Sequence, residues 1–418
     1  MTSGLSADTI RFLPGRVRRP HRRGPGTRLA SVRSTMRFLH TADWHLGRLF
    51  HGVNLTEDQR HLLEGLLRLA SESRVDAVLV AGDIYDRAVP PAEAVDLLDE
   101  VLSRLVLDLR VPVVLIAGNH DSPQRLSFLS RLLESNRLHV LGALHRDAEP
   151  IVVEDGSGPV CIHAIPYADP AAVRGWLGCD DVHDHEAALR KVVARIQTPA
   201  RRGRSILVAH AFVAGGEASE SERPLSVGGA FTVSPEVLSG FDYVALGHLH
   251  RPQCVGTEAL RYSGSLMKYS FSEASHKKAV LLVEMDAQGR CRAEAVSLSP
   301  RRDLRVVEGH LSEILAGPGA GESREDYIAV RLRDTDMIFD VMGKLRQVYP
   351  NVLHVERLGR NAEGAEAGRR VDHRKMSEDE IFRTFYREVA KEELTERQAS
   401  LLASVVEGLR KAEREDEP

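Results

Sequence analysis

Apolar runs and helical patterns alternate through the part of the chain that follows an arginine-rich N-terminal tail. Continuous apolar residues predict strands at 37–43, 76–83 and 111–121. Between them, leucines recur on one helical face over 57–74, and 93–107 has a second helical pattern. Strands that are apolar on both faces and separated by helices are typical of βαβ units in a buried sheet.

Fewer helical patterns separate the later strand candidates, so the arrangement changes along the chain. These candidates are 160–167, 204–210, 241–248, 276–286 and 292–299. We therefore expect an α/β fold built as a two-sheet β-sandwich flanked by helices. Residues 299–309 are interpreted as the exit from this domain.

The C-terminal part of the chain predicts two smaller structures. Residues 325–358 have a strand–helix–strand pattern, enough for a small α/β capping domain. Two charged helices follow, with apolar residues at three- and four-residue steps. They either fold back on the core or on each other, or bind a partner as helices in a groove. The expected domains are a disordered basic tail (1–35), a main domain (36–300), the capping domain (301–358), a linker (359–376) and a helical partner-binding segment (377–418).

Charge is distributed unevenly between the tail and the rest. The first 35 residues hold eight arginines and one acid, a formal charge of +7. Because the whole chain has a formal charge of −4, residues 36–418 have a formal charge of −11. A protein that binds nucleic acid by bulk charge alone would not be acidic. The tail has no apolar segment of a secretory signal. It is interpreted as disordered or as an upstream start-codon choice, with a nucleic-acid-binding arm as the alternative.

Cysteines and apolar runs narrow the class of protein further. The four cysteines lie far apart and form no Cys-x-x-Cys pair, which argues against a disulfide framework or a zinc knuckle. No run approaches the ~18 consecutive apolar residues of a membrane span. We expect a reduced, cytoplasmic protein without a membrane segment.

Side chains that can bind a cation lie at the ends of five of the predicted strands or just after them. They are Asp43, His45, Asp83, Asp86, Asn119, His120, Asp121, His210, His248 and His250. The carboxyl ends of strands are where ligands gather in α/β folds. Carboxylates and imidazoles suit two divalent ions, which can stabilise the entering and leaving oxygens of an in-line phosphoryl displacement. The alternative, a set of core His and Asp residues, is disfavoured because buried ionisable groups cost several kcal/mol unless they are paired or metal-bound.

The order of these motifs carries a family resemblance. D-x-H, G-D-x-x-D, G-N-H-D, a lone H and G-H-x-H follow one another as they do in the calcineurin-like metallophosphoesterases. Longer stretches, including LHTADWHLG, GDIYDR, GNHDSPQRL, ALGHLHRPQ and YSGSLMKYSFSE, resemble the nuclease subunits within that family, over about residues 36–350.

The resemblance implies a ligand set for two Mn²⁺ ions, with Mg²⁺ as a weaker substitute. One ion would be held by Asp43, His45, Asp83 and His250, and the other by Asp83, Asn119, His210 and His248. Asp83 would bridge them. His120 would protonate the leaving oxygen, and Asp121 would orient the His120 side chain.

The resemblance also implies an activity and partners. The expected protein is a DNA nuclease of repair, recombination and replication, with 3′→5′ exonuclease action on duplex ends and endonuclease action on single strands and hairpins. It would act with a coiled-coil ATPase, as a homodimer within a heterotetramer. The alternatives are a small-molecule or cyclic-nucleotide phosphodiesterase, which would not need residues 325–358, and a non-catalytic scaffold, against which the intact ligand motifs argue.

Three other polar residues receive structural interpretations. His40 lies inside an apolar strand and is interpreted as a core histidine. His185 is expected to cap a helix or face solvent. Arg302 belongs either to a DNA-facing patch or to a solvated strand end.

Overall fold

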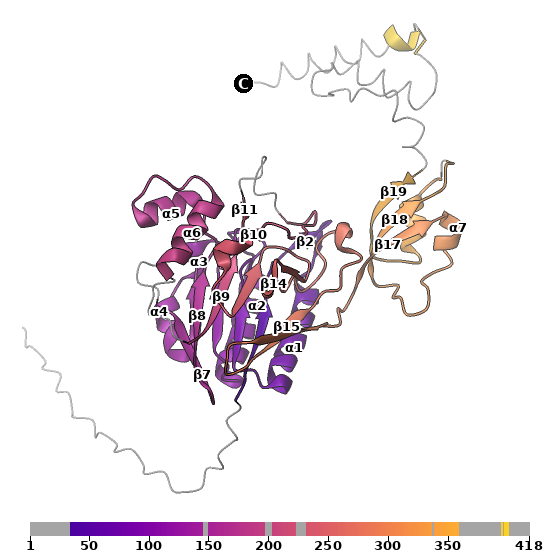
Figure 1. Ribbon diagram of the computed structural model, residues 1–418. Coiled ribbons are helices and arrows are strands. Elements are labelled where there is room, and N and C mark those ends of the chain that lie inside the picture. The colour runs from indigo at the N-terminus through magenta and orange to yellow at the C-terminus, as the bar shows by residue number, and fades with distance from the viewer. Residues whose placement is uncertain are drawn as a thin grey trace, which may run out of the picture. The chain divides into compact units, whose positions relative to one another are not determined.

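The computed structural model describes most of the chain between the N-terminal tail and the C-terminal linker. The described residues are 34–144, 149–196, 203–222, 231–336, 338–358, 394–395 and 397–400. The predictions for residues 1–33, for the linker and for nearly all of the C-terminal helices therefore lie outside the described residues. The chain divides into two compact units between Asp303 and Leu304 (Figure 1). None of the helices within the described ranges is both long and apolar enough to cross a bilayer.

The first unit contains two six-stranded sheets, the first in the order β16-β15-β1-β4-β5-β6. Its strands are β1 (Met36–Thr41), β4 (Ala77–Val80), β5 (Val113–Ile116), β6 (Leu138–Leu141), β15 (Val280–Met285) and β16 (Cys291–Val296). The strands β1, β4, β5 and β6 are parallel, while β15 and β16 run antiparallel to their neighbours.

The second sheet has the order β13-β14-β12-β9-β8-β7. Its strands are β7 (Ile151–Asp155), β8 (Gly158–Ile165), β9 (Arg204–His210), β12 (Tyr243–Gly247), β13 (Gln253–Val255) and β14 (Thr257–Tyr262). Again four neighbouring strands, β8, β9, β12 and β14, are parallel, and the edge strands β7 and β13 are antiparallel. Each sheet thus aims the carboxyl ends of its four parallel strands in one direction.

The two sheets pack face to face around one apolar core. Phe38 and Val114 of the first sheet share this core with Ile206 and Ala245 of the second. Because Val113 is buried as well, β5 is covered on both faces, as its continuous apolar sequence predicts. The predicted two-sheet sandwich is confirmed.

Helices flank the sandwich. They are α1 (Thr56–Ser73), α2 (Ala92–Ser103), α3 (Pro123–Leu126), α4 (Ser130–Leu133), α5 (Pro170–Leu177) and α6 (His185–Ile196). Val173 of α5 and Leu189 of α6 pack against Leu207 and Val244 of the second sheet. The predicted helix 93–107 is divided, because α2 continues into a π-helical turn at Arg104–Asp108.

Short elements connect these parts. They are the strands β2 (Leu49–Phe50), β3 (Val53–Asn54), β10 (Phe212–Val213) and β11 (Thr232–Val233), with 3-10 turns at Glu134–Asn136, Pro235–Leu238 and Phe271–Glu273. Sequence patterns missed these, and they also missed the strands β6, β7, β13 and β14 and the helices α3, α4 and α5, since such short segments show too few residues to establish a period.

The second unit contains a three-stranded parallel sheet in the order β17-β18-β19. Its elements are β17 (Leu304–Gly309), α7 (Leu311–Ile314), β18 (Tyr327–Leu332), α8 (Val341–Arg346) and β19 (Val352–Arg357). Ile328, Val330, Leu345 and Tyr349 form its core. The strand–helix–strand pattern of 325–358 is present. The boundary between the two units lies within 299–309, the segment interpreted as the exit from the main domain, and Leu304–Gly309 pairs with β18 as the first strand of the second unit.

Candidate two-metal centre

The residues singled out at strand ends all lie at the carboxyl edge of the two sheets. Asp43 and His45 follow β1, the Asp83–Asp86 turn follows β4, and the Asn119–Asp121 turn follows β5. His210 is the last residue of β9, and His248 and His250 follow β12. The sandwich therefore brings together side chains that are up to about two hundred residues apart in the sequence.

The backbone turns sharply where these side chains are presented. Four of these residues have a positive φ, a region that residues other than glycine rarely adopt. The values are 53° for Asp43, 45° for His45, 48° for Asp83 and 109° for His248. Such conformations cost on the order of 1–3 kcal/mol each and cluster at functional sites. Packing around the turns is equally tight, because a Cβ on Gly82 would collide with the His210 ring.

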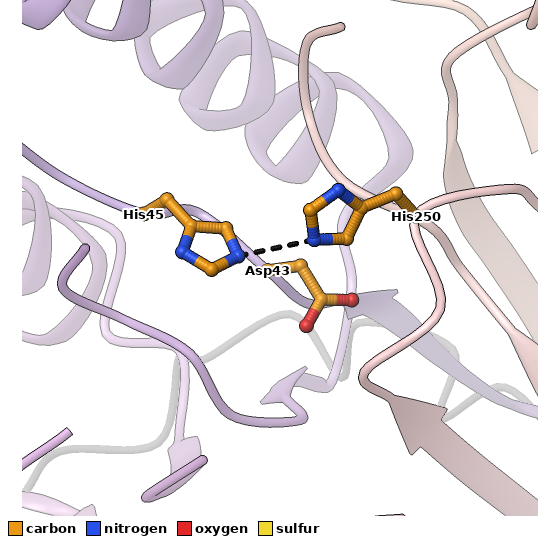
Figure 2. Close-up of side chains that lie close together, drawn as sticks. All are labelled: Asp43, His45 and His250. Carbon is orange, nitrogen blue, oxygen red and sulfur yellow. Dashed lines mark hydrogen bonds between the residues drawn. The ribbon is translucent and has the colours of Figure 1, made fainter. Parts of the chain in front are cut away.

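The first group of ligands joins both sheets. Asp43, His45 and His250 each place a ligand atom within 4.8 Å of the others. Figure 2 shows the two imidazole rings facing each other beside the Asp43 carboxylate, with 3.1 Å between the Nε2 atoms. Asp83 Oδ2 lies 3.7 Å from His45 Nε2, so this carboxylate also reaches the group.

The second group lies on the other side of Asp83. The same Oδ2 atom is 3.6 Å from His210 Nε2. Asn119 Oδ1 lies 2.9 Å from that nitrogen and 3.1 Å from His248 Nδ1. One oxygen of Asp83 is thus near imidazoles of both groups, which is the position that a bridging ligand needs.

Electrostatics at the site suit a cation. Burial, followed by the charge of Asp83, raises the pKa of Asp43 well above its usual value. Burial also lowers the pKa of His45 and His248, with further lowering by neighbouring imidazoles, and that of His210 to about 4. Neutral imidazoles have a free lone pair for a metal, and two adjacent buried carboxylates repel each other unless a cation lies between them. The donor set therefore fits divalent metal ions.

His120 faces the same space from β5. Its Nδ1 lies 2.8 Å from the backbone carbonyl oxygen of Asp86, so this nitrogen carries the proton of that hydrogen bond. Its Nε2 lies 4.0 Å from Asp83 Oδ2 and is the atom that faces the site. The backbone N–H of His120 also donates to Asp83 Oδ1, at 2.9 Å.

Asp121 acts on the turns. Its carboxylate accepts hydrogen bonds from the backbone N–H groups of Ile84, Tyr85 and Gly118, at 2.9–3.0 Å. Burial, followed by the charge of Asp83, raises the pKa of Asp121 to about 6. These bonds tie together the two turns that carry Asp83 and His120, so any orienting effect on the His120 ring passes through the backbone.

Asp86 supports the first group from behind. Its Oδ1 is 3.7 Å from His45 Nδ1 and forms an ion pair of 2.8 Å with Arg48. Gln59 on α1 holds the same loop, because its side-chain amide donates to the backbone oxygens of Trp44 and His45 and accepts from the N–H of Gly47. Sequence reasoning missed Gln59, because nothing in an amphipathic helix marks one buried glutamine as a partner of a distant loop.

The three residues with structural interpretations have different outcomes. His40 is a satisfied core histidine, as predicted, with Nδ1 3.0 Å from Tyr243 Oη and Nε2 3.1 Å from the Leu246 oxygen. The solvent-facing alternative for His185 was wrong. This residue is buried with Nε2 2.9 Å from Tyr167 Oη, and Asp184 makes the bond to the helix start instead. Arg302 forms an ion pair with the buried Asp58.

Comparisons with known proteins agree on the catalytic unit. Residues 36–252 match the family described as calcineurin-like phosphoesterases. Residues 300–390 match a domain described as the type 5 capsule protein repressor C-terminal domain.

Curated relatives extend over nearly the whole chain. The D subunit of the nuclease SbcCD from Staphylococcus epidermidis is 31% identical over 365 residues, which is 87% of this chain and 96% of that protein. Its counterpart in Staphylococcus saprophyticus is 31% identical over 375 residues, 90% of this chain and 98% of the relative. Among solved structures, a dimetal phosphatase from Danio rerio is 15% identical with a TM-score of 0.37, covering 63% of this chain and 99% of its own.

Proposed function

The chain belongs to the calcineurin-like phosphoesterase family and to its group of SbcCD D subunits, and on that premise we propose that it is a Mn²⁺-dependent DNA nuclease. The proposed activities are 3′→5′ exonuclease action on duplex ends and endonuclease action on single strands and hairpins, in DNA repair and recombination. The observation that carries the proposal is the position of Asp83, which lies within 3.7 Å of imidazoles in both ligand groups.

We assign the ligands of the two ions from this geometry. The first ion would bind Asp43, His45, Asp83 and His250, and the second would bind Asp83, Asn119, His210 and His248. When bound, two divalent ions supply Lewis-acid stabilisation to both the attacking and the leaving oxygen of a phosphodiester. Mg²⁺ usually keeps several waters and few protein ligands, whereas each set here offers four protein groups, so Mn²⁺ is the better match.

His120 would then act as the general acid. The Asp86 carbonyl holds the proton on Nδ1, so Nε2 is the nitrogen that gains and loses a proton facing the phosphodiester. A group that donates its proton to the leaving oxygen must be within hydrogen-bond reach of it, and the His120 ring lies beside the bridging carboxylate. Asp121 is assigned as a positioning residue for the turns.

Partners follow from the family and from the charge of the chain. Residues 36–418 carry a formal charge of −11, so DNA affinity would come in part from an SbcC-like coiled-coil ATPase. We propose residues 36–300 as the nuclease domain, 301–358 as a DNA-binding cap and 377–418 as the segment that binds the ATPase.

A homodimer within the heterotetramer is supported by an exposed apolar surface. Phe128, Leu129 and Leu132, on α4 and the turn before it, are 73%, 51% and 69% exposed. Large apolar side chains that are grouped and solvent-exposed mark interaction surfaces more often than single ones do.

Two experiments test these assignments. The purified protein with Mn²⁺ should cleave a DNA hairpin and leave a cyclic nucleotide intact; the reverse preference would identify a small-molecule phosphodiesterase, and cleavage of neither would favour a scaffold. A chain that lacks residues 372–418 should still cleave small model phosphodiesters but fail to co-purify with the ATPase. Full-strength binding by the shortened chain would contradict the partner assignment.

A further inference from the structure

A buried polar network surrounds the ligand His250 on the side away from the first ligand group. Glu273 is fully buried, Ser221 and Glu222 are each 8% exposed, and the Lys278 side chain is also 8% exposed. These residues come from the loop after β10 and from the segment that precedes β15. Such a concentration of buried charge is costly unless the groups satisfy one another.

Hydrogen-bond donors and acceptors in this network can be assigned in one way. Lys278 Nζ lies 2.5 Å from Glu273 Oε2, an ion pair that keeps Glu273 an acceptor. Ser221 Oγ contacts both Glu273 Oε1 and His250 Nδ1, the latter at 2.6 Å, and Glu273 Oε1 itself lies 3.4 Å from His250 Nδ1. Because the carboxylate can only accept, the Ser221 hydroxyl donates to it and must accept from His250. The proton of the neutral imidazole therefore lies on Nδ1.

This assignment leaves His250 Nε2 with its lone pair directed toward Asp43 and His45. The backbone of His250 is held as well, since its N–H donates to Glu222 Oε1 at 2.7 Å and its carbonyl accepts from Lys278 Nζ at 2.7 Å. Both the ring tautomer and the loop position of His250 thus depend on groups that do not reach the phosphodiester site.

We propose that Glu273 is a positioning residue that acts through Ser221 to fix the Nδ1–H tautomer of His250 and so prepares Nε2 to bind the first metal ion. This inference rests on the proposed two-metal function. Groups that hydrogen-bond to metal-binding histidines fix their tautomer and raise their basicity, and their loss typically costs about 10- to 100-fold in metal affinity.

Glu273→Gln provides a directional test. Lys278 will select the amide oxygen of the new side chain, so the amide NH₂ faces Ser221. The Ser221 hydroxyl then accepts from the amide and donates to His250, which reverses the chain and moves the ring proton to Nε2. The nitrogen that should bind the metal is thereby protonated.

The measurements are ¹⁵N NMR of the histidine tautomers in the metal-free protein and Mn²⁺ titration by calorimetry. We expect the His250 signals to change from the Nδ1–H to the Nε2–H pattern, and one class of Mn²⁺ site to weaken about 10- to 100-fold while the other is unchanged. Asp155→Asn is the matched control. It removes the carboxylate of another buried ion pair, in which the Asp155 side chain is 4% exposed and the Arg204 side chain is 5% exposed.

The control should lower thermal stability without changing either the tautomer or the Mn²⁺ affinities. Ser221→Ala should weaken Mn²⁺ binding at the same site, and Ser221→Thr, which keeps the hydroxyl, should retain the affinity of the unaltered protein. If Glu273→Gln does not fold, this pair of variants tests the proposed role of the hydrogen-bond chain. Unchanged tautomer and affinities in folded Glu273→Gln would overturn the inference. Failure of the unaltered protein to bind Mn²⁺ would instead contradict the proposed function, and the tautomer measurement would still test the role of Glu273.

Discussion

Each six-stranded sheet contains four neighbouring parallel strands, with β15 and β16 added on one side of the first sheet and an antiparallel strand at each edge of the second, but the two sheets contribute different chemistry to the site. The first sheet supplies both carboxylates, the Asn119 amide and the imidazoles of His45 and His120. From the second sheet come only imidazoles, those of His210, His248 and His250. Negative charge therefore lies on one sheet, and most of the neutral nitrogen ligands lie on the other.

This difference has a physical consequence for assembly. Neither sheet holds a complete ligand set, since each proposed ion needs an Asp from the first sheet and a His from the second. The site forms only when the apolar inner faces of the sheets pack together, so metal binding depends on the same core that stabilises the sandwich. Protein–metal affinity and folding stability are coupled in such a case.

The largest effect is expected from the carboxylate that both ligand groups share. Asp83→Ala should reduce bound Mn²⁺ from two ions to none and reduce cleavage to background, because its Oδ2 lies near imidazoles of each group. Asp43→Ala, also on the first sheet, should chiefly affect one ion. Mass spectrometric metal analysis of the folded variants decides between these outcomes, and two ions retained by Asp83→Ala would exclude a bridge.

A smaller, purely catalytic effect is expected at His120. His120→Ser should keep both ions but slow phosphodiester cleavage about 10²- to 10⁴-fold, the usual contribution of a positioned general acid. The loss should be much smaller for a nitrophenyl ester, whose leaving group needs no proton. An equal loss of cleavage rate on both substrates, or a loss of bound metal together with the rate, would contradict the assignment of His120 as the general acid.

The smallest effect concerns a hydrogen bond between the sheets. Tyr243→Phe keeps the ring that packs on Phe38 but deprives His40 Nδ1 of its partner at 3.0 Å. Leaving a buried polar group unsatisfied costs about 1–3 kcal/mol. Urea unfolding should show this loss, while the metal content of the folded variant stays at the unaltered value. A drop in metal content without a change in stability would mean that this bond acts on the site and not on the sandwich.

Sequence patterns predicted the parts of the candidate site that are local in the chain. Each cluster, such as Asp43 with His45 or Asn119 with His120, lies within a few residues after an apolar strand, so both the element and its chemistry are visible in one short window. The predicted strands extend too far toward the C-terminus, however, because the backbone leaves the β region before it reaches the ligand residues. β4 ends at Val80, and Gly82 and Asp83 already have positive φ.

The supporting residues could not be predicted in the same way. Glu273 and Lys278 lie in a segment without periodicity, and they reach His250 only in the folded chain, Lys278 directly and Glu273 both directly and through Ser221 of the loop after β10. Gln59 lies on a helix whose apolar face explains its neighbours but not its side chain. Contacts of this kind depend on how distant segments meet, and a single sequence does not contain that information.

The left-handed backbone of the ligand turns also constrains how an inactive form of this protein should be made. Asp43 and Asp83 have φ values of 53° and 48°, a region that asparagine tolerates and that alanine does not favour. Asparagine has nearly the same shape as aspartate, but it is neutral and carries an NH₂ donor in place of one carboxylate oxygen. An Asp83→Asn chain should therefore keep its loops in place and still accept DNA, which makes it the better choice for trapping an uncleaved substrate complex for crystallography.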